Sequence, residues 1–128
     1  MSTKALFYNR LKLMFSPTYI KSARKMYKHI AETLVKTAKS NKLQVDYYFG
    51  RSEPIMRIKK NYSRKFEVYV VPSKFEIVMM SKVRATEKEM KPYRIKVRKA
   101  KSADFKFEFE LYNTKTLQFA KKLINKVN

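Results

Sequence analysis

Between residues 43 and 112, apolar and polar side chains alternate repeatedly, and this pattern limits the possible folds more than any other feature of the sequence. Successive side chains of a β-strand point to opposite faces, so the alternation predicts strands that bury one face. It predicts about six strands, near residues 43–49, 54–60, 65–70, 75–81, 93–98 and 105–112. The fourth of them is apolar almost throughout, which is typical of a central strand buried on both faces.

Apolar residues at helical spacing flank this strand region on both sides. One stripe starts at Ser16-Pro17, a favoured N-cap and first helical residue, and ends near Asn41. Asn113-Thr114 can cap a second stripe at the C-terminal end, and residues 1–15 carry a weaker one that we expect at the periphery. Strands flanked by helices predict a single α+β domain over residues 1–128, with a long N-terminal helix, a mainly antiparallel sheet and a C-terminal helix packed on one sheet face.

The charge of the chain predicts a polyanionic partner. The chain has 31 Lys and Arg against 10 Asp and Glu, a net charge of +21, whereas solubility alone needs a net charge of about 2–8. Hydrophobic residues make up 45% of the chain and aromatic residues 14%, which indicates a folded domain and not a disordered basic tail. Phosphate backbones bind Lys and Arg without sequence preference, so nucleic acid is the expected partner.

Several kinds of catalytic and cofactor site are excluded. The chain has no Cys, one Gly and one His, so it cannot form a thiolate metal site, a glycine-rich phosphate loop or a paired-histidine site. We therefore expect no catalytic residues, no metal and no cofactor, and we do not expect an enzyme. The N-terminus lacks the pattern of a signal peptide and the apolar runs are too short to span a bilayer, so we expect an intracellular protein.

The distribution of acids selects a candidate phosphate-binding set among the basic residues. In the predicted fifth strand, Arg94, Lys96 and Arg98 lie opposite two glutamates of the sixth, so we expect them to be partly neutralised. Apart from Glu67, the basic residues of 51–65 have no comparable acid partners in the nearby sequence. Together with two lysines of the loop between the last two predicted strands, they supply the core of the set: Arg57, Lys59, Lys60, Arg64, Lys99 and Lys101. The basic face of the long helix extends this set with Lys21, Lys25 and Lys28.

Tyrosines at polar strand positions favour RNA or single-stranded nucleic acid over duplex DNA. Tyr48, Tyr69 and Tyr112 face outward on their strands, and Tyr62 lies in a basic turn. Bases stack on aromatic side chains, and this mode is commoner with RNA or single strands than with duplex DNA. Tyr62 and Tyr69 are the stacking candidates. A chain rich in Lys, Asn, Tyr and Phe with one Gly also fits an AT-rich genome, so a viral or ribonucleoprotein component is one interpretation.

Two other functions are left open by the sequence. A strongly basic domain can dock on an acidic protein surface, for example as an inhibitor or adaptor of a polymerase or nuclease. A small ribonuclease that cleaves RNA without a metal, using Lys, Arg and Tyr, would have a similar composition. Membrane binding is not expected, because only the N-terminal segment offers large apolar residues beside basic ones.

Overall fold

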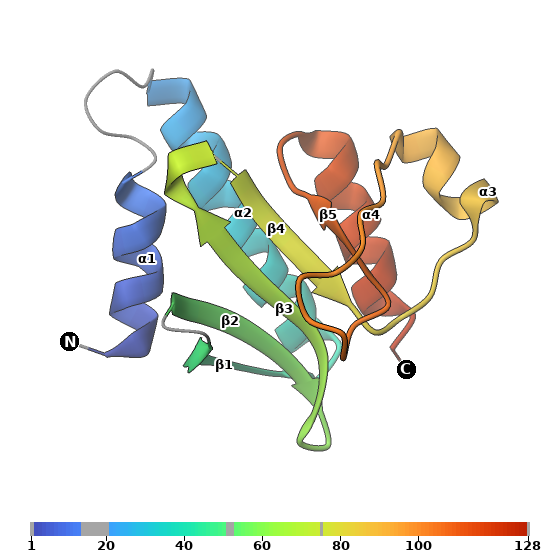
Figure 1. Ribbon diagram of the computed structural model, residues 1–128, viewed down its shortest axis with the longest axis horizontal. Coiled ribbons are helices and arrows are strands. Elements are labelled where there is room, and N and C mark those ends of the chain that lie inside the picture. Colours follow the sequence, from blue (N-terminus) through green and yellow to red (C-terminus); the bar gives the residue numbers. More distant parts are fainter. Residues whose placement is uncertain (1, 14–20, 51–52, 75, 128) are drawn as a thin grey trace.

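The computed structural model describes residues 2–13, 21–50, 53–74 and 76–127, and of residues 13, 21–27 and 50 it describes the backbone alone. It is an α+β fold, as predicted, in which helices gather on one side of an antiparallel sheet (Figure 1). The elements, in chain order, are α1 (Thr3–Leu13), α2 (Lys21–Ser40), β1 (Gln44–Gly50), β2 (Glu53–Lys60), β3 (Ser63–Val71), η1 (Pro72–Lys74), β4 (Glu76–Ser81), α3 (Glu87–Met90), η2 (Lys91–Tyr93), β5 (Phe107–Glu110) and α4 (Thr114–Asn125).

In the described residues, the sheet is an antiparallel meander of five strands in the order β1-β2-β3-β4-β5. The loop between β2 and β3 consists of Asn61 and Tyr62, both with positive φ (50° and 67°). This is the type I′ geometry that matches the twist of a hairpin and favours Asn followed by Gly. β4 lies between β3 and β5, and its residues from Ile77 to Met80 are all buried, which confirms the prediction of a central strand.

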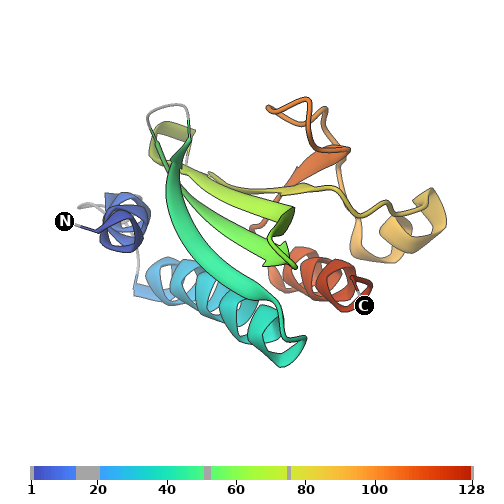
Figure 2. The same cartoon turned by 90° about the horizontal axis from the view of Figure 1, so that it is seen from below.

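The main core lies between the sheet and the helices α1, α2 and α4 (Figure 2). Both long helical stripes are confirmed by the buried residues that they contribute, which are Ile30, Ala31, Leu34 and Ala38 from α2 and Leu117, Ala120, Leu123 and Ile124 from α4. Asn113 caps α4 by accepting a hydrogen bond from the backbone N–H of Thr116 at 2.8 Å. The helix start predicted at Ser16-Pro17 lies outside the described residues.

Helix α1 belongs to this core and is not peripheral. Phe7 and Leu11 lie four residues apart on one face of the helix and are both buried. The ring of Phe7 lies 5.6 Å from that of Tyr47 in β1, between centroids. No helix within the described ranges combines the length and the apolar character that crossing a membrane requires.

The strand predicted at residues 93–98 does not form, so the described sheet has five strands and not six. Thr86 and Glu89 form a capping box that starts the short helix α3 and turns the chain away from the sheet. Tyr93 then ends η2, and Arg94 has a left-handed backbone with a φ of 54°, which is incompatible with a strand. The alternation in this segment therefore belongs to an irregular, mostly exposed stretch of chain.

The segment between the last two predicted strands helps to form a second, smaller core on the sheet face opposite the helices, which we call the open face. An isolated bridge joins Arg98 to Glu108, and β5 is shorter than the predicted strand. Val97 is 47% exposed. Phe105 is buried and packs with Ala100 on the open face, against buried residues of the central strands. Residues 99–106 thus cover part of the open face.

Candidate nucleic-acid interface

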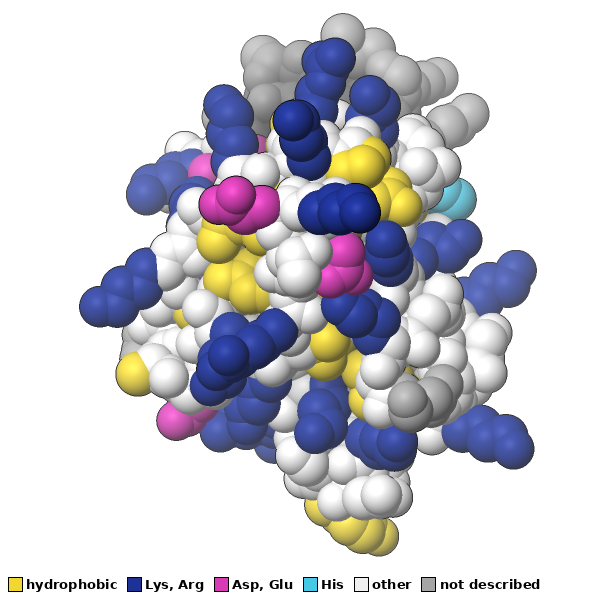
Figure 3. Space-filling view, turned by 90° about the vertical axis from the view of Figure 1, so that its right-hand side faces the viewer, with side chains coloured by type: hydrophobic (Ala, Val, Ile, Leu, Met, Phe, Trp, Pro, Cys, Tyr) yellow, Lys and Arg dark blue, Asp and Glu magenta, His cyan; other side chains and the backbone are white. Residues whose placement is uncertain are grey.

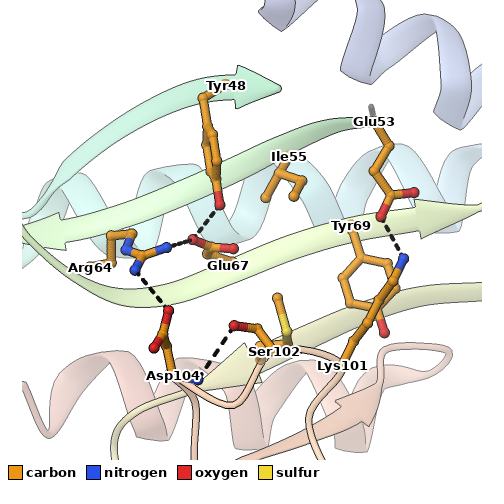
Figure 4. Close-up of a pocket in the computed structure, with 10 residues that line it drawn as sticks. Tyr48, Glu53, Ile55, Arg64, Glu67, Tyr69, Lys101, Ser102 and Asp104 are labelled. Atoms are coloured by element: carbon orange, nitrogen blue, oxygen red, sulfur yellow. Dashed lines mark hydrogen bonds and ion pairs between the residues drawn. The ribbon is translucent and has the colours of Figure 1, made fainter. Parts of the chain in front are cut away.

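Two of the basic residues that the sequence selects, Arg64 and Lys101, line a cavity on the open face. This open-face pocket has a volume of about 230 Å³, and Ile55 and Met80 are the aliphatic residues of its lining. Polar side chains from β1, β2 and β3 meet side chains of residues 99–106 around it (Figure 4). The pocket contains both signs of charge, so its electrostatics depend on how these groups pair.

Glu67 is the centre of the first ion-pair network in the pocket. It is buried on β3, and its Oε1 lies 2.9 Å from Arg64 Nη1 and accepts a hydrogen bond from the hydroxyl of Tyr48. Arg57 Nε lies 4.0 Å from the same oxygen, and its guanidinium stacks 3.4 Å above the Tyr48 ring. Arg64 Nη2 also reaches Asp104 at 3.2 Å. Both arginines therefore serve to neutralise a buried carboxylate.

The strand register explains the place of Arg57 in this network. Asp46 of β1 is the partner of Arg57 of β2, and Arg57 is the partner of Glu67 of β3. Opposite charges on neighbouring strands attract, and their alternation across three strands stabilises the sheet. Lys59, also on β2, pairs with the same aspartate: its Nζ lies 2.6 Å from Oδ2 of Asp46.

A second network has Glu108 as its centre. This buried β5 carboxylate accepts hydrogen bonds from the Tyr69 hydroxyl at 2.9 Å and from the backbone N–H of Lys101 at 2.7 Å, and Arg98 Nη2 lies 2.9 Å away. Burial, followed by the hydrogen bond to Glu108, raises the pKa of Tyr69 well above its ordinary value. Lys101 Nζ pairs with Glu53 at 2.8 Å. The network fixes residues 99–106 against the sheet.

The acid partners of the predicted core set come from Glu67, three residues after Arg64, from neighbouring strands and from the covering segment. Four residues of the predicted core set lie in ion pairs: Arg57, Lys59, Arg64 and Lys101. Of the triplet that we expected to be partly neutralised, Arg98 pairs with Glu108 and Glu76, as predicted for Glu108. Arg94 and Lys96 make no ion pair with any described residue, because the strand that would have placed them opposite glutamates does not form.

The other predicted cations are dispersed. Lys60 Nζ donates to the carbonyl oxygen of Val127 at 3.1 Å, and Lys99 is exposed. Lys28 is exposed on α2 and lies 3.8 Å from Glu32. The side chains of Lys21 and Lys25 lie outside the described residues.

The tyrosines separate into buried and exposed ones. Tyr69 lies on the predicted face of its strand, but residues 99–106 cover it, and at 5% exposure its ring cannot offer a face to a base. Tyr112 is 41% exposed, and Tyr62, at the tip of the β2–β3 hairpin, is 83% exposed. Tyr62 therefore fits the predicted stacking role better than Tyr69.

Among the side chains that the structure describes, the largest group of cations without an ion pair lies in residues 82–99, which we call the basic segment. This segment packs beside α4, where Tyr93 contacts Phe119 with 5.6 Å between ring centroids. Lys126 Nζ anchors it by reaching Glu89 at 2.8 Å and the carbonyl oxygen of Arg84 at 3.0 Å. Figure 3 views this side, where Lys and Arg side chains far outnumber acidic ones. Seven of its cations make no ion pair with any described residue: Lys82, Arg84, Lys88, Lys91, Arg94, Lys96 and Lys99.

Glu89 also has a shifted pKa in this anchor. Its side chain accepts hydrogen bonds from Lys126 and from the backbone N–H of Thr86. These two contacts, the first being the larger, lower the pKa of Glu89 from 4.5 to about 2. The anchor is therefore intact at neutral pH.

Across the described residues, eight of the ten acids lie in ion pairs with basic side chains: Glu32, Asp46, Glu53, Glu67, Glu76, Glu89, Asp104 and Glu108. The excess positive charge therefore resides on cations without a carboxylate partner. Among the same residues, no group of three His, Asp or Glu side chains is placed to hold a metal ion.

Comparison with known proteins gives no relative from which a function could be transferred. No protein-family model, no curated protein and no solved structure matches the chain.

Proposed function

We propose that this protein binds nucleic acid, with RNA or single strands preferred, through phosphate contacts made by its unpaired cations. The observation that carries the proposal is the pairing of most acids with a minority of the basic residues. Redirecting an ion-paired cation to a phosphate would leave its carboxylate unpaired, which is costly when that carboxylate is buried. An unpaired, exposed lysine has no such penalty, and its counterion is released when a phosphate binds.

The proposed footprint consists of the basic segment and the tip of the β2–β3 hairpin. The segment offers the unpaired cations, including Lys99 from the predicted set, and the hairpin offers Lys60 and Tyr62. Arg57, Lys59, Arg64 and Lys101 hold the fold together around the open-face pocket and are not part of the footprint.

Tyr62 is the proposed stacking residue because its conformation is unfavourable for its residue type. It occupies the second position of a type I′ turn with a φ of 67°, where Gly is preferred. A left-handed backbone costs a non-glycine residue about 1–2 kcal/mol. The ring is 83% exposed and therefore gains little from packing in return. A strained, exposed tyrosine at the tip of a basic hairpin is suited to contact a base.

The test is the salt dependence of binding. Fluorescence anisotropy with 12-nucleotide oligo(rU), oligo(dT) and a duplex of equal length, between 50 and 300 mM salt, should give a log–log slope of about −0.7 per neutralised phosphate for single strands. The triple variant Lys88→Gln, Lys91→Gln, Lys96→Gln should have a shallower slope by about 2. The matched variant Lys4→Gln, Lys12→Gln, Lys74→Gln loses the same charge elsewhere and should change the slope less. Affinity that is independent of salt would contradict the proposal.

Tyr62→Gly tests the stacking role. Relief of the backbone strain should raise the free energy of unfolding by about 1 kcal/mol, while loss of the ring should weaken single-strand binding by about 1–3 kcal/mol. The control Tyr112→Leu removes an exposed ring outside the hairpin and should leave the affinity unchanged. If Tyr62→Gly binds as tightly as the parent protein, Tyr62 does not stack on a base.

Two further measurements on this protein distinguish the alternative functions. A protein that docks on an acidic partner would bind oligonucleotides weakly but would retain its partner after nuclease treatment of a native extract. A metal-independent ribonuclease would shorten the labelled oligo(rU) in EDTA.

A further inference from the structure

A second cavity lies on the other side of the molecule, in the groove between α2 and α4. The two helices lie side by side beneath the sheet (Figure 2), and Asn41 Nδ2 donates to Asn125 Oδ1 at 2.8 Å near their C-terminal ends. They run in the same direction, because five antiparallel strands separate them along the chain. The cavity has a volume of about 520 Å³ and is lined by one ridge of side chains from each helix.

The groove contains no acid among the described residues that line it. Lys36 from α2 and Lys121 from α4 contribute positive charge from opposite walls, and neither pairs with a described carboxylate. The nearest acid of α2 in the sequence, Glu32, pairs with Lys28 and does not line the cavity. Apart from Leu117 and His29, the rest of the lining consists of Thr, Ser, Asn and Gln side chains.

This composition is unusual for two neighbouring helices. Facing helix edges are commonly stabilised by pairs of opposite charge, whereas here both walls carry lysine and neutral hydrogen-bonding groups. Lysine, Ser, Thr, Asn and Gln are also the side chains that most often contact phosphate oxygens and sugars in nucleic-acid complexes. The missing negative charge can therefore come from a ligand.

We propose that the α2–α4 groove binds the sugar-phosphate backbone of a nucleic-acid strand. This inference rests on the proposed function and assigns to it a site that lies apart from the predicted residues of the open face. Lys36 and Lys121 neutralise phosphates of the strand, and Thr33, Thr37 and Gln118 hydrogen-bond its oxygens. The groove thereby supplies a fixed track, whereas the basic segment supplies exposed charge on the far side of α4.

The test compares two variants that lose the same charge. Lys36→Gln with Lys121→Gln removes the groove cations, and Lys4→Gln with Lys74→Gln removes two exposed lysines on α1 and η1. Each phosphate contact of a single strand contributes about fivefold to affinity at 0.1 M salt relative to 1 M. The groove variant should therefore bind 12-nucleotide oligo(rU) about 25-fold more weakly, with a salt slope shallower by about 1.4. The control variant should lose less than about threefold. Amide resonances of Thr33, Thr37 and Gln118 should shift when the oligonucleotide is added.

Three outcomes can be distinguished. A selective loss in the groove variant, with unchanged urea denaturation, supports the groove. Equal losses in both variants, with no shifts at the groove amides, overturn the groove while salt-dependent binding still supports the proposed function. If the parent protein does not bind any oligonucleotide, the proposed function and the groove both fail.

Discussion

The open-face pocket and the α2–α4 groove are both polar hollows, but they differ in how positive charge is balanced. In the pocket, Arg64 and Lys101 pair with carboxylates of the same chain. In the groove, Lys36 and Lys121 both line the cavity, and no described carboxylate lines it with them. In a chain of net charge +21, the density of basic residues alone therefore does not identify a binding site. The absence of carboxylate partners is the more informative feature.

The largest expected effect comes from breaking the pocket. Glu67→Ala would leave Arg57 and Arg64 without their shared carboxylate, and removal of one partner from a buried ion pair costs about 3 kcal/mol. Urea denaturation should show this loss, while single-strand affinity is retained under conditions where the variant is folded. Glu87→Gln, which removes an acid with no ion pair among the described residues, should change stability by less than about 0.5 kcal/mol. A stable Glu67→Ala variant would show that the network is not structural.

The salt concentration sets the balance between two effects on stability, the attraction within ion pairs and the repulsion among unpaired cations. Between 10 mM and 1 M salt, the Debye length falls from about 30 Å to about 3 Å. Screening weakens the ion pairs of the pocket, but it also weakens repulsion among the unpaired cations. Because unpaired cations are in excess, we expect the midpoint of thermal unfolding to rise with salt. A fall in this midpoint would mean that the ion pairs contribute more than the repulsion.

The groove can be made to resemble the pocket with one substitution. Gln118→Glu adds a carboxylate three and four residues before Lys121 and Lys122, which should stabilise α4 by about 0.2–0.5 kcal/mol. The same carboxylate should repel a phosphate by about 1 kcal/mol at 4 Å in water, which is about fivefold in affinity. Gln44→Glu, in β1, makes the same chemical change outside the groove and should leave the affinity within twofold of the parent, or about 0.4 kcal/mol. Equal effects of the two variants would argue against the groove.

The smallest effect concerns the anchor between the basic segment and α4. The pKa of Glu89 is lowered to about 2, below its ordinary value of 4.5. A carboxylate with a lowered pKa stabilises the folded state above its ordinary pKa, and this contribution is lost as the pH falls from 4.5 toward 2. Lys126→Gln should move the pKa back toward 4.5, as followed by the carboxyl ¹³C shift of Glu89, because it removes the largest cause. Lys122→Gln should leave this pKa unchanged.

The elements that the sequence predicts well are those with a strong local period and a buried face. The stripes of α2 and α4 and the apolar run of β4 all lie where the spacing places them. At residues 93–98, by contrast, a strong local period does not correspond to the predicted element. Their basic and apolar residues alternate as in a strand, but the capping box at Thr86 and the left-handed backbone of Arg94 decide the local structure. The capping residues are present in the sequence and could have indicated the helix.

The ion pairs of the candidate residues could be predicted only in part from the sequence, because ion pairing is not a local property. Glu67 lies within ten residues of Arg57 and Arg64, yet Asp104 reaches Arg64 only through the packing of residues 99–106 on the open face. The same packing buries Tyr69, whose position on its strand had suggested an exposed ring. No local sequence pattern indicates the groove, because its two walls come from α2 and α4, which lie far apart in the sequence.

By itself, the sequence determines the fold class, the positions of most elements and the large positive charge, since periodicity and composition are read along the chain. The tertiary structure decides which charges meet. Strand register places Glu67 beside Arg57, and the packing of residues 99–106 brings Asp104 to Arg64. Helix packing brings Lys36 and Lys121 to one groove without a described carboxylate in its lining. Electrostatic interaction depends on distance in space, so the charges left for a ligand emerge only after the chain has folded.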